Sequence, residues 1–177
     1  MFRLSLLNTH LPMLTRTKAI VLHLTKHNDT SSIAHLFTDT HGRVSIMVYG
    51  LSGKRSSMTS AAFAPLNIIE LNADFDRENI MPRINTKSIE ILQHSAHSNI
   101  TQKTQLIFIA ELLYSVLTHQ LQDTALFNWL ATQIYDLSSH TSPDKHLSIM
   151  LQLTHFLGIT PQIDTPDRKS TRLNSSH

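Results

Sequence analysis

The spacing of apolar residues changes near residue 98, and this change limits the fold more than any other feature of the chain. Between Thr17 and about Ile91, apolar and polar residues alternate in short runs, as in Val44, Ile46 and Val48, which is typical of β-strands. From residue 99 onward, apolar residues recur three and four positions apart, which is typical of amphipathic α-helices. One element cannot satisfy both periods, so the sequence predicts an α+β chain whose strands precede its helices.

The first half of the chain predicts a small barrel. Runs typical of strands lie at 18–27, 31–40, 43–50, 66–75 and 80–92. Gly42 lies in a short polar break and can adopt the positive φ that a tight hairpin needs. Pro82 cannot donate to a strand ladder, so the last strand is expected to begin there or to lie at an edge. Five short strands with a long polar loop at 51–65 favour a small barrel.

Alternation along the strands predicts which side chains face inward. Ile20, Leu22 and Leu24 are expected to share one face of the first strand, and Phe37 is expected in the core. Tyr49 has the opposite parity to Val44, Ile46 and Val48, so its ring is expected outside, either stacked on a base or simply exposed.

The second half predicts three helices, at about 101–120, 123–139 and 142–158. Asp123 is expected to cap the second helix, while Pro143 lies near the start of the third and Gly158 at its end. The first helix is expected to bury Leu106, Ile109, Ala110, Leu113, Val116 and Leu117. The second is expected to bury Leu126, Trp129, Leu130, Ile134 and Leu137. The third helix is apolar almost all round, at Leu147, Ile149, Met150, Leu151, Leu153, Phe156 and Leu157. Such a helix needs partners on several sides, so the helical part is expected to be incomplete.

Charge is distributed unevenly along the chain. Residues 13–98 carry nine Lys and Arg against seven Asp and Glu, whereas residues 99–166 carry two against five. A phosphate-binding surface is therefore expected in the strand half. No segment resembles a signal peptide or a membrane span, and the absence of cysteine excludes disulfides and thiolate zinc sites in this chain.

The two ends of the chain are expected to be foreign to the protein. Met13 directly precedes the first strand, so we expect it to be the natural start and residues 1–12 to be a non-native extension. Residues Asp167–His177 match, codon by codon, the translation of a common sequencing-adapter oligonucleotide. We therefore expect this basic tail to be an artefact joined to a truncated gene fragment, and to say nothing about DNA binding.

The order of these elements resembles one known family. A "KAIVL" strand, the hairpin "LFTDTHGRVSIMVYG" and the strand "FAPLNIIELN" follow one another as in the RecO family of bacterial DNA-repair and recombination-mediator proteins. The likeness extends from Lys18 to about Asp164 and includes "HFLGITPQID" near its end. It implies that residues 13–98 form an OB-fold domain and that residues 99–166 begin an all-helical domain.

The resemblance also implies a function. Members of the family bind single-stranded DNA, anneal complementary strands without ATP, and act in the RecF pathway with RecR. They contact the acidic tail of the single-stranded DNA-binding protein (SSB) and help RecA load onto coated DNA. A bacterial, cytoplasmic protein associated with the nucleoid is therefore expected, with no membrane partner. Many members carry a four-cysteine zinc motif beyond the point where this chain ends, and no cofactor is expected within it.

An OB-fold binds single strands with a positive groove and aromatic faces. The candidate phosphate partners are Arg16, Lys18, Lys26, Arg43, Lys54, Arg55, Arg83 and Lys87, and the candidate stacking residue is Tyr49. Lys54 and Arg55 are best placed, since the family clusters basic residues in this loop. In the family this loop is usually denser in Lys and Arg than it is here. We therefore expect the affinity of this chain for single strands to fall only slowly as the salt concentration rises. The alternative for each cation is a solvated surface charge.

Catalytic and metal-binding alternatives have little support in the sequence. The twelve histidines include two pairs of suitable spacing, His23 with His27 and His94 with His97, but neither has a recognised set of carboxylates nearby. The acidic run at 74–78 lacks the spacing of a calcium loop, and no Gly-rich phosphate loop occurs. No enzyme is expected. Two alternatives to a mediator remain: a generic OB-fold nucleic-acid binder with a helical interaction module, and a helical scaffold whose barrel has no nucleic-acid role.

Overall fold

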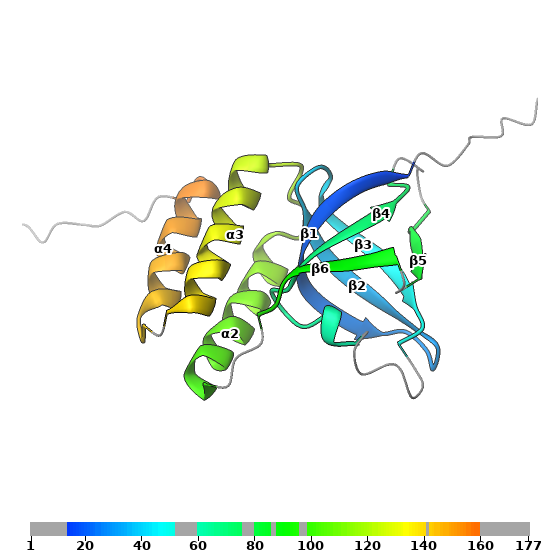
Figure 1. The fold of residues 1–177 in the computed structure, drawn as a ribbon. Coiled ribbons are helices and arrows are strands. Elements are labelled where there is room, and N and C mark those ends of the chain that lie inside the picture. Colours follow the sequence, from blue (N-terminus) through cyan, green and yellow to red (C-terminus); the bar gives the residue numbers. More distant parts are fainter. Residues whose placement is uncertain are drawn as a thin grey trace, which may run out of the picture.

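The structure is a computed structural model that describes residues 14–51, 60–75, 80–85, 88–95, 99–140 and 142–159. A curled sheet forms one end of the molecule, and helices stack in layers beside it at the other end (Figure 1). The strands are β1 (Thr15–Lys26), β2 (Ser31–Thr38), β3 (Gly42–Tyr49), β4 (Ile68–Ala73), β5 (Arg83–Asn85) and β6 (Ile89–Gln93). The helices are α2 (Ile100–Val116), α3 (Thr124–Ser139) and α4 (Lys145–Phe156). The predicted α+β class, with a strand barrel before helices, is confirmed.

The short link between β5 and β6 requires the sheet to curl. The sheet runs in the order β5-β3-β2-β1-β4-β6, so these two consecutive strands lie at opposite edges. Asn85 ends β5 and Ile89 begins β6, so the two residues lie at most ~14 Å apart. The edges of a flat sheet of six strands would be ~24 Å apart. The sheet must therefore bend until its edges approach, which produces the barrel-like shape.

The predicted fifth strand is two strands in the structure. β5 pairs in parallel with β3, whereas β6 pairs antiparallel with β4. The run at 80–92 crosses from one edge of the curled sheet to the other, and this crossing interrupts it. β5 begins directly after Pro82 and lies at an edge, as the sequence predicted.

A bulge in β1 inverts the alternation of its side chains. The pairing with β2 shifts register between Val21 and His23. Ile20 and Leu22 face the helices, whereas Leu24 packs against the interior of the barrel. The prediction that all three share a face is wrong for Leu24, because one extra residue in a strand exchanges its two faces beyond that point.

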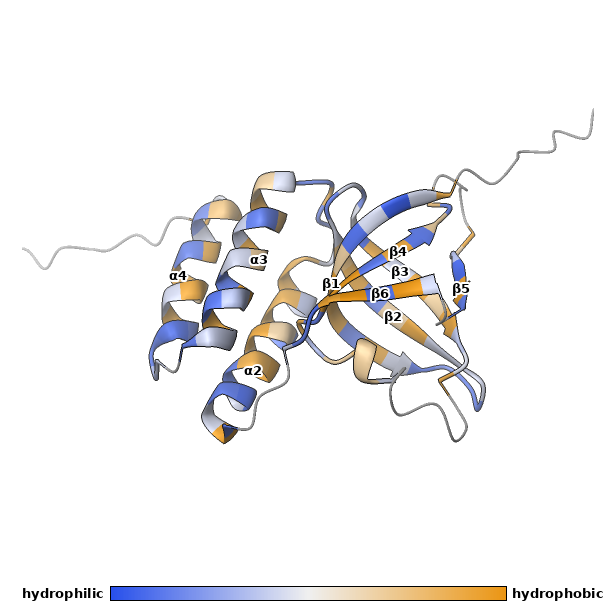
Figure 2. Ribbon diagram, in the orientation of Figure 1, coloured by the Kyte–Doolittle hydropathy of each residue, from blue (hydrophilic) through white to orange (hydrophobic). Residues whose placement is uncertain are grey.

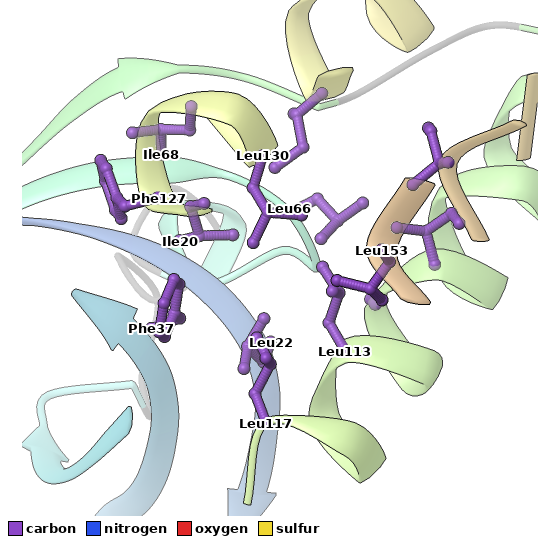
Figure 3. Packing of buried hydrophobic residues seen from close by; sticks show 14 of the residues in the cluster. Ile20, Leu22, Phe37, Leu66, Ile68, Leu113, Leu117, Phe127, Leu130 and Leu153 are labelled. Atoms are coloured by element: carbon purple, nitrogen blue, oxygen red, sulfur yellow. The ribbon is translucent and has the colours of Figure 1, made fainter. Parts of the chain in front are cut away.

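Two hydrophobic cores result, one inside the curled sheet and one between the sheet and the helices. Ala34, Leu36, Ile46 and Val48 belong to the interior core. The second core joins Ile20, Leu22, Phe37, Leu66 and Ile68 of the strand half to Leu113, Leu117, Phe127, Leu130 and Leu153 of the helices (Figure 3). Phe37 is fully buried, as predicted, but in this second core. The two halves of the chain therefore share a packed interface.

The Gly42 hairpin packs closely against the connection between α2 and α3. Gly42 has a φ of +65°, as a tight turn requires. A Cβ atom at this position would lie 2.5 Å from the carbonyl oxygen of Gln120, a distance that real structures do not show. The next residue, Arg43, donates its backbone N–H to the same oxygen at 2.9 Å. Glycine is therefore needed here for both its conformation and its lack of a side chain.

Helix ends follow the predicted caps. The Asp123 carboxylate accepts a hydrogen bond from the backbone N–H of Leu126 at 2.9 Å, which confirms it as the cap of α3. Gly158 has a φ of +68° directly after α4. The following N–H, of Ile159, donates to the carbonyl of Thr154 at 2.9 Å, which completes a Schellman-type helix end.

Burial follows the predicted stripes of α2 and α3 with two differences. Val116, near the end of α2, is 39% exposed. Trp129 is only half-buried, since it lies between α3 and α4 with its ring centroid 4.8 Å from that of Phe156. Phe127 instead occupies the buried position, 6.2 Å from the ring of Phe37. The difference arises because the sheet and α4 contact different sides of α3, and periodicity does not say which neighbour each side meets.

Helix α4 forms the outermost layer and is covered on one side. Ile149 and Leu153 are buried, whereas Leu147, Leu151 and Phe156 are 53%, 65% and 40% exposed. Hydrophobic residues recur along this helix, the one furthest from the sheet (Figure 2). Within the described part of the chain, partners on several sides are therefore not present. None of the helices described is long and apolar enough to cross a bilayer.

Candidate nucleic-acid interface

The outer surface of β3 and β5 brings together several predicted residues. Ile46 and Val48 point into the barrel, so Ser45, Met47 and Tyr49 point outward, as predicted. On the neighbouring strand, Arg83 pairs with Met47 and Asn85 with Tyr49. We call the outward residues Arg43, Ser45, Met47, Tyr49 and Arg83 the β3 face. Arg43 and Tyr49 lie six residues apart along it, about 20 Å, which provides a surface several nucleotides long.

Tyr49 is half-buried on this face rather than fully exposed. Its hydroxyl lies 3.0 Å from the Sδ atom of Met47, to which it donates a weak hydrogen bond. The predicted stacking role therefore stays a prediction, and the ring lies on the side of the sheet that such a role requires.

Arg43 is a half-buried cation without a carboxylate partner among the described residues. Its guanidinium lies over the ring of Tyr114 on α2, with the central carbon 4.8 Å from the ring centroid. Its Nη1 atom is buried and donates no hydrogen bond to any described residue. Burial lowers the pKa of Arg43, and the Tyr114 hydroxyl opposes that effect. Arg43 remains charged, because the ordinary pKa of a guanidinium lies far above neutral pH.

Two histidines surround the same tyrosine. The rings of His23 and His35 lie 4.7 Å and 5.2 Å from that of Tyr114. His35 Nδ1 lies 2.8 Å from the Ser45 hydroxyl. His23 Nδ1 lies 3.2 Å from a carboxylate oxygen of Glu111.

The pKa of His35 reflects its burial and its charged neighbours. Burial lowers the pKa of His35, and Arg43 and His23 lower it further. The residues His23, His35, Arg43, Tyr114 and Glu111, here called the junction cluster, join three strands to α2. Of these five, the sequence predicted only Arg43 as a site residue. A signal was present in the excess of histidines, but their proximity depends on the pairing of β1 with β2.

Arg16 and Lys18 lie on another part of the outer surface, next to acids. Arg16 forms an ion pair with Glu70, the neighbour of Lys18 across the β1–β4 ladder. The hydrogen bond from Arg16 holds the pKa of Glu70 below its ordinary value, and it raises that of Arg16. Glu90 of β6 pairs with Glu70 on the same side. We call these residues the β1 face; it holds as many carboxylates as cations.

The remaining predicted cations are scattered. Lys26 lies in an exposed ion pair with Asp29 at 3.2 Å, and Arg83 is exposed on β5. Lys54, Arg55 and Lys87 lie outside the described residues. The structure therefore brings Arg43, Tyr49 and Arg83 onto one face, but places Arg16, Lys18 and Lys26 elsewhere.

Metal binding has no structural support within the described residues. They contain no group of three or more His, Asp or Glu side chains that could hold an ion. The chain has no cysteine, so its residues do not fit the thiolate zinc site that the family resemblance associates with a more C-terminal segment.

Comparison with known proteins matches this chain to one family. Residues 13–92, which contain almost the whole curled sheet, match the family model for the N-terminal part of recombination protein O. The DNA repair protein RecO of Bacteroides fragilis is 32% identical over 161 residues, covering 86% of this chain and 64% of that protein. RecO of Flavobacterium psychrophilum is 31% identical over 157 residues, covering 88% and 66%.

The likeness extends beyond the sheet. RecO of Porphyromonas gingivalis is 32% identical over 155 residues, covering 85% of this chain and 63% of that protein, so the similarity includes both the sheet and the helices. The chain spans just under two thirds of the length of these relatives. Since the N-terminal model matches the sheet and full-length relatives match both halves in order, this protein belongs to the RecO family.

Proposed function

We propose that this protein acts in bacterial DNA repair by binding single-stranded DNA on the outer surface of its barrel. The observation that carries the proposal is the coincidence of the matched family segment, 13–92, with a curled sheet whose β3 face presents cations beside aromatic rings. Cations that face phosphates and rings that face bases are the means by which such barrels hold single strands. The relatives are named as DNA repair proteins, which agrees with this role.

The finer proposal is that of a recombination mediator in the RecF pathway. Binding to two complementary strands neutralises their phosphates, which lowers the repulsion that opposes pairing. No nucleotide is needed for such annealing, which is non-enzymatic. We further propose that the protein works with RecR in the bacterial cytoplasm, near the nucleoid, and helps RecA load onto strands coated with SSB.

We also propose a binding site for the SSB tail in the helical half. A groove of about 620 Å³ lies between α2 and α4, lined mainly by apolar residues such as Ile100, Phe108, Leu147 and Met150. His146 lines it too, and Lys145 lies beside His146 at the start of α4. An acidic tail with an apolar end would suit an apolar groove that has a lysine beside it. Lys145 is, however, already within 3.4 Å of Asp136, so its contribution to the rim is reduced.

Annealing assays test the mediator proposal. Two complementary oligonucleotides, each coated with SSB, are mixed with this protein or with the full-length B. fragilis relative, and duplex formation is followed by fluorescence. Acceleration by both proteins supports the proposal. Acceleration by neither would contradict it, and single-strand binding without annealing would instead favour the generic nucleic-acid binder. A salt titration tests the scaffold alternative, because an affinity that does not change with salt means that no phosphate is bound.

A further inference from the structure

The junction cluster concentrates positive and titratable groups from four elements around one ring. His23 comes from β1, His35 from β2, Arg43 from β3, and Tyr114 and Glu111 from α2. Glu111 is the one carboxylate that contacts this cluster in the described residues, and its side chain is 56% exposed. When both histidines are protonated, the cluster holds three positive charges against one negative charge.

Arg43 has a hydrogen-bond donor without an acceptor among the described residues. Its Nη1 atom is buried without an acceptor in the described part of the chain. A buried donor that lacks an acceptor is destabilising, so native proteins retain few of them. A guanidinium that lies over an aromatic ring and keeps an N–H without an acceptor is well suited to bind an oxygen of a phosphate.

We infer that the junction cluster binds a backbone phosphate of single-stranded DNA, and that His35 takes up a proton as the phosphate binds. This inference rests on the proposed single-strand binding and adds its regulation: affinity increases as the pH falls. The site lies at the end of the β3 face nearest the helices, so a strand that follows this face would reach α2.

Proton uptake by His35 determines how the affinity for single-stranded DNA changes with pH. In the free protein, burial lowers the pKa of His35, and the neighbouring Arg43 and His23 lower it further. A bound phosphate supplies the missing negative charge and raises that pKa, so the complex holds more protons than the free protein. A pKa that is one unit or more higher in the complex corresponds to about tenfold tighter binding at the acidic end of the range.

Oligothymidine is a suitable probe, because thymine does not titrate between pH 6 and pH 8. We expect its affinity, measured by fluorescence anisotropy at constant ionic strength, to increase about tenfold from pH 8 to pH 6. The double variant His23→Gln with His35→Gln should retain less than a threefold change. The control His140→Gln with His155→Gln replaces two exposed histidines, one directly after α3 and one in α4, and should respond to pH like the parent.

The outcomes separate this inference from the proposed function. Absence of oligothymidine binding by the parent at both pH values would contradict the proposed function. Binding that does not change with pH, or a pH response that survives in the histidine double variant, would overturn the inference alone.

Glu111→Gln provides a second test if the histidine variant does not fold. This change removes the carboxylate of the cluster, so we expect oligothymidine to bind two- to threefold more tightly. Weaker binding by a folded Glu111→Gln variant would overturn the inference.

The free parent should also lose thermal stability below about pH 6.5, because His35 takes up a proton more readily in the unfolded chain than in the folded one. Bound oligothymidine should reduce that loss.

Discussion

Arg43 and Arg16 lie on the outer surface of the same sheet but meet opposite surroundings. Arg16, on the β1 face, is paired with Glu70, and Glu90 lies on the same side. Arg43, on the β3 face, lies over Tyr114 and has a buried nitrogen without an acceptor among the described residues. A cation that already has a carboxylate gains little from a phosphate, since it must give up one partner for the other. We therefore expect the surroundings of a cation to matter more for phosphate binding than the number of cations.

The largest effect is expected from breaking the hairpin that carries Arg43. Gly42→Ala requires a left-handed conformation of alanine and places its Cβ 2.5 Å from the Gln120 oxygen. We expect the free energy of unfolding to fall by about 2–4 kcal/mol, measured by chemical denaturation. Gly158→Ala is the matched control, since it has the same sign of φ but nothing within 4 Å. It should cost about 1 kcal/mol. Equal losses for both variants would mean that the hairpin does not dock tightly.

Reversal of the loop charges is expected to give the next largest effect. Lys54→Glu with Arg55→Glu should weaken single-strand binding about tenfold at low salt, with a nearly unchanged thermal midpoint. The slope of log affinity against log salt should become shallower by about 0.7 for each phosphate that the loop no longer neutralises. The control reverses Arg168 and Lys169, an adjacent basic pair outside the family match, and should leave the affinity nearly unchanged. Equal affinity for the loop variant and the parent would remove this loop from the site.

A direct comparison of the two faces uses the same substitution on each. Arg43→Met keeps the apolar stem and removes the buried charge, so we expect about fivefold weaker binding of oligothymidine and a thermal midpoint that is unchanged or higher. Arg16→Met should change the affinity less than twofold. Anisotropy and thermal melts measure both effects. A larger loss of affinity from Arg16→Met would reverse our assignment of the faces.

The smallest effect is expected from releasing Arg16. Glu70→Gln removes the partner of Arg16 and should strengthen single-strand binding about twofold at low salt. The pKa of Glu70 is lowered by Arg16, so this pair stabilises the fold above the unfolded carboxyl pKa of about 4.3. That contribution is lost as the pH falls through the lower folded pKa. The variant should therefore show a weaker loss of stability in acid, and an unchanged acid response would contradict the pairing.

Much of the architecture could be predicted from local patterns. The hairpin at Gly42, the cap at Asp123 and the helix end at Gly158 depend on residues within a few positions of one another, and all three are confirmed. The parity of β3 was also predictable, because inward and outward residues alternate strictly there. The division of residues 80–92 into β5 and β6 was not, since it depends on how far the sheet curls.

The candidate site was less predictable than the fold. The β1 bulge placed Leu24 in the other core, because a single added residue exchanges the faces of a strand. Tyr114 was not identified because it contributes to the site only through the packing of α2 against the sheet. The ion pair of Arg16 with Glu70 joins residues that are 54 positions apart in the sequence, so counting charges could not reveal it.

The sequence by itself determined the order of strands before helices, the ends of the helices, the family resemblance and the placement of most positive charge in the strand half. These properties follow from spacing, turn chemistry and composition, which act over short distances along the chain. Only the tertiary structure decided that Arg16 pairs with Glu70, whereas Arg43 has no carboxylate partner among the described residues and lies in a cluster with two histidines and a tyrosine. These contacts exist because the sheet curls and α2 packs on its outer surface, which brings residues far apart in sequence within a few ångströms of one another.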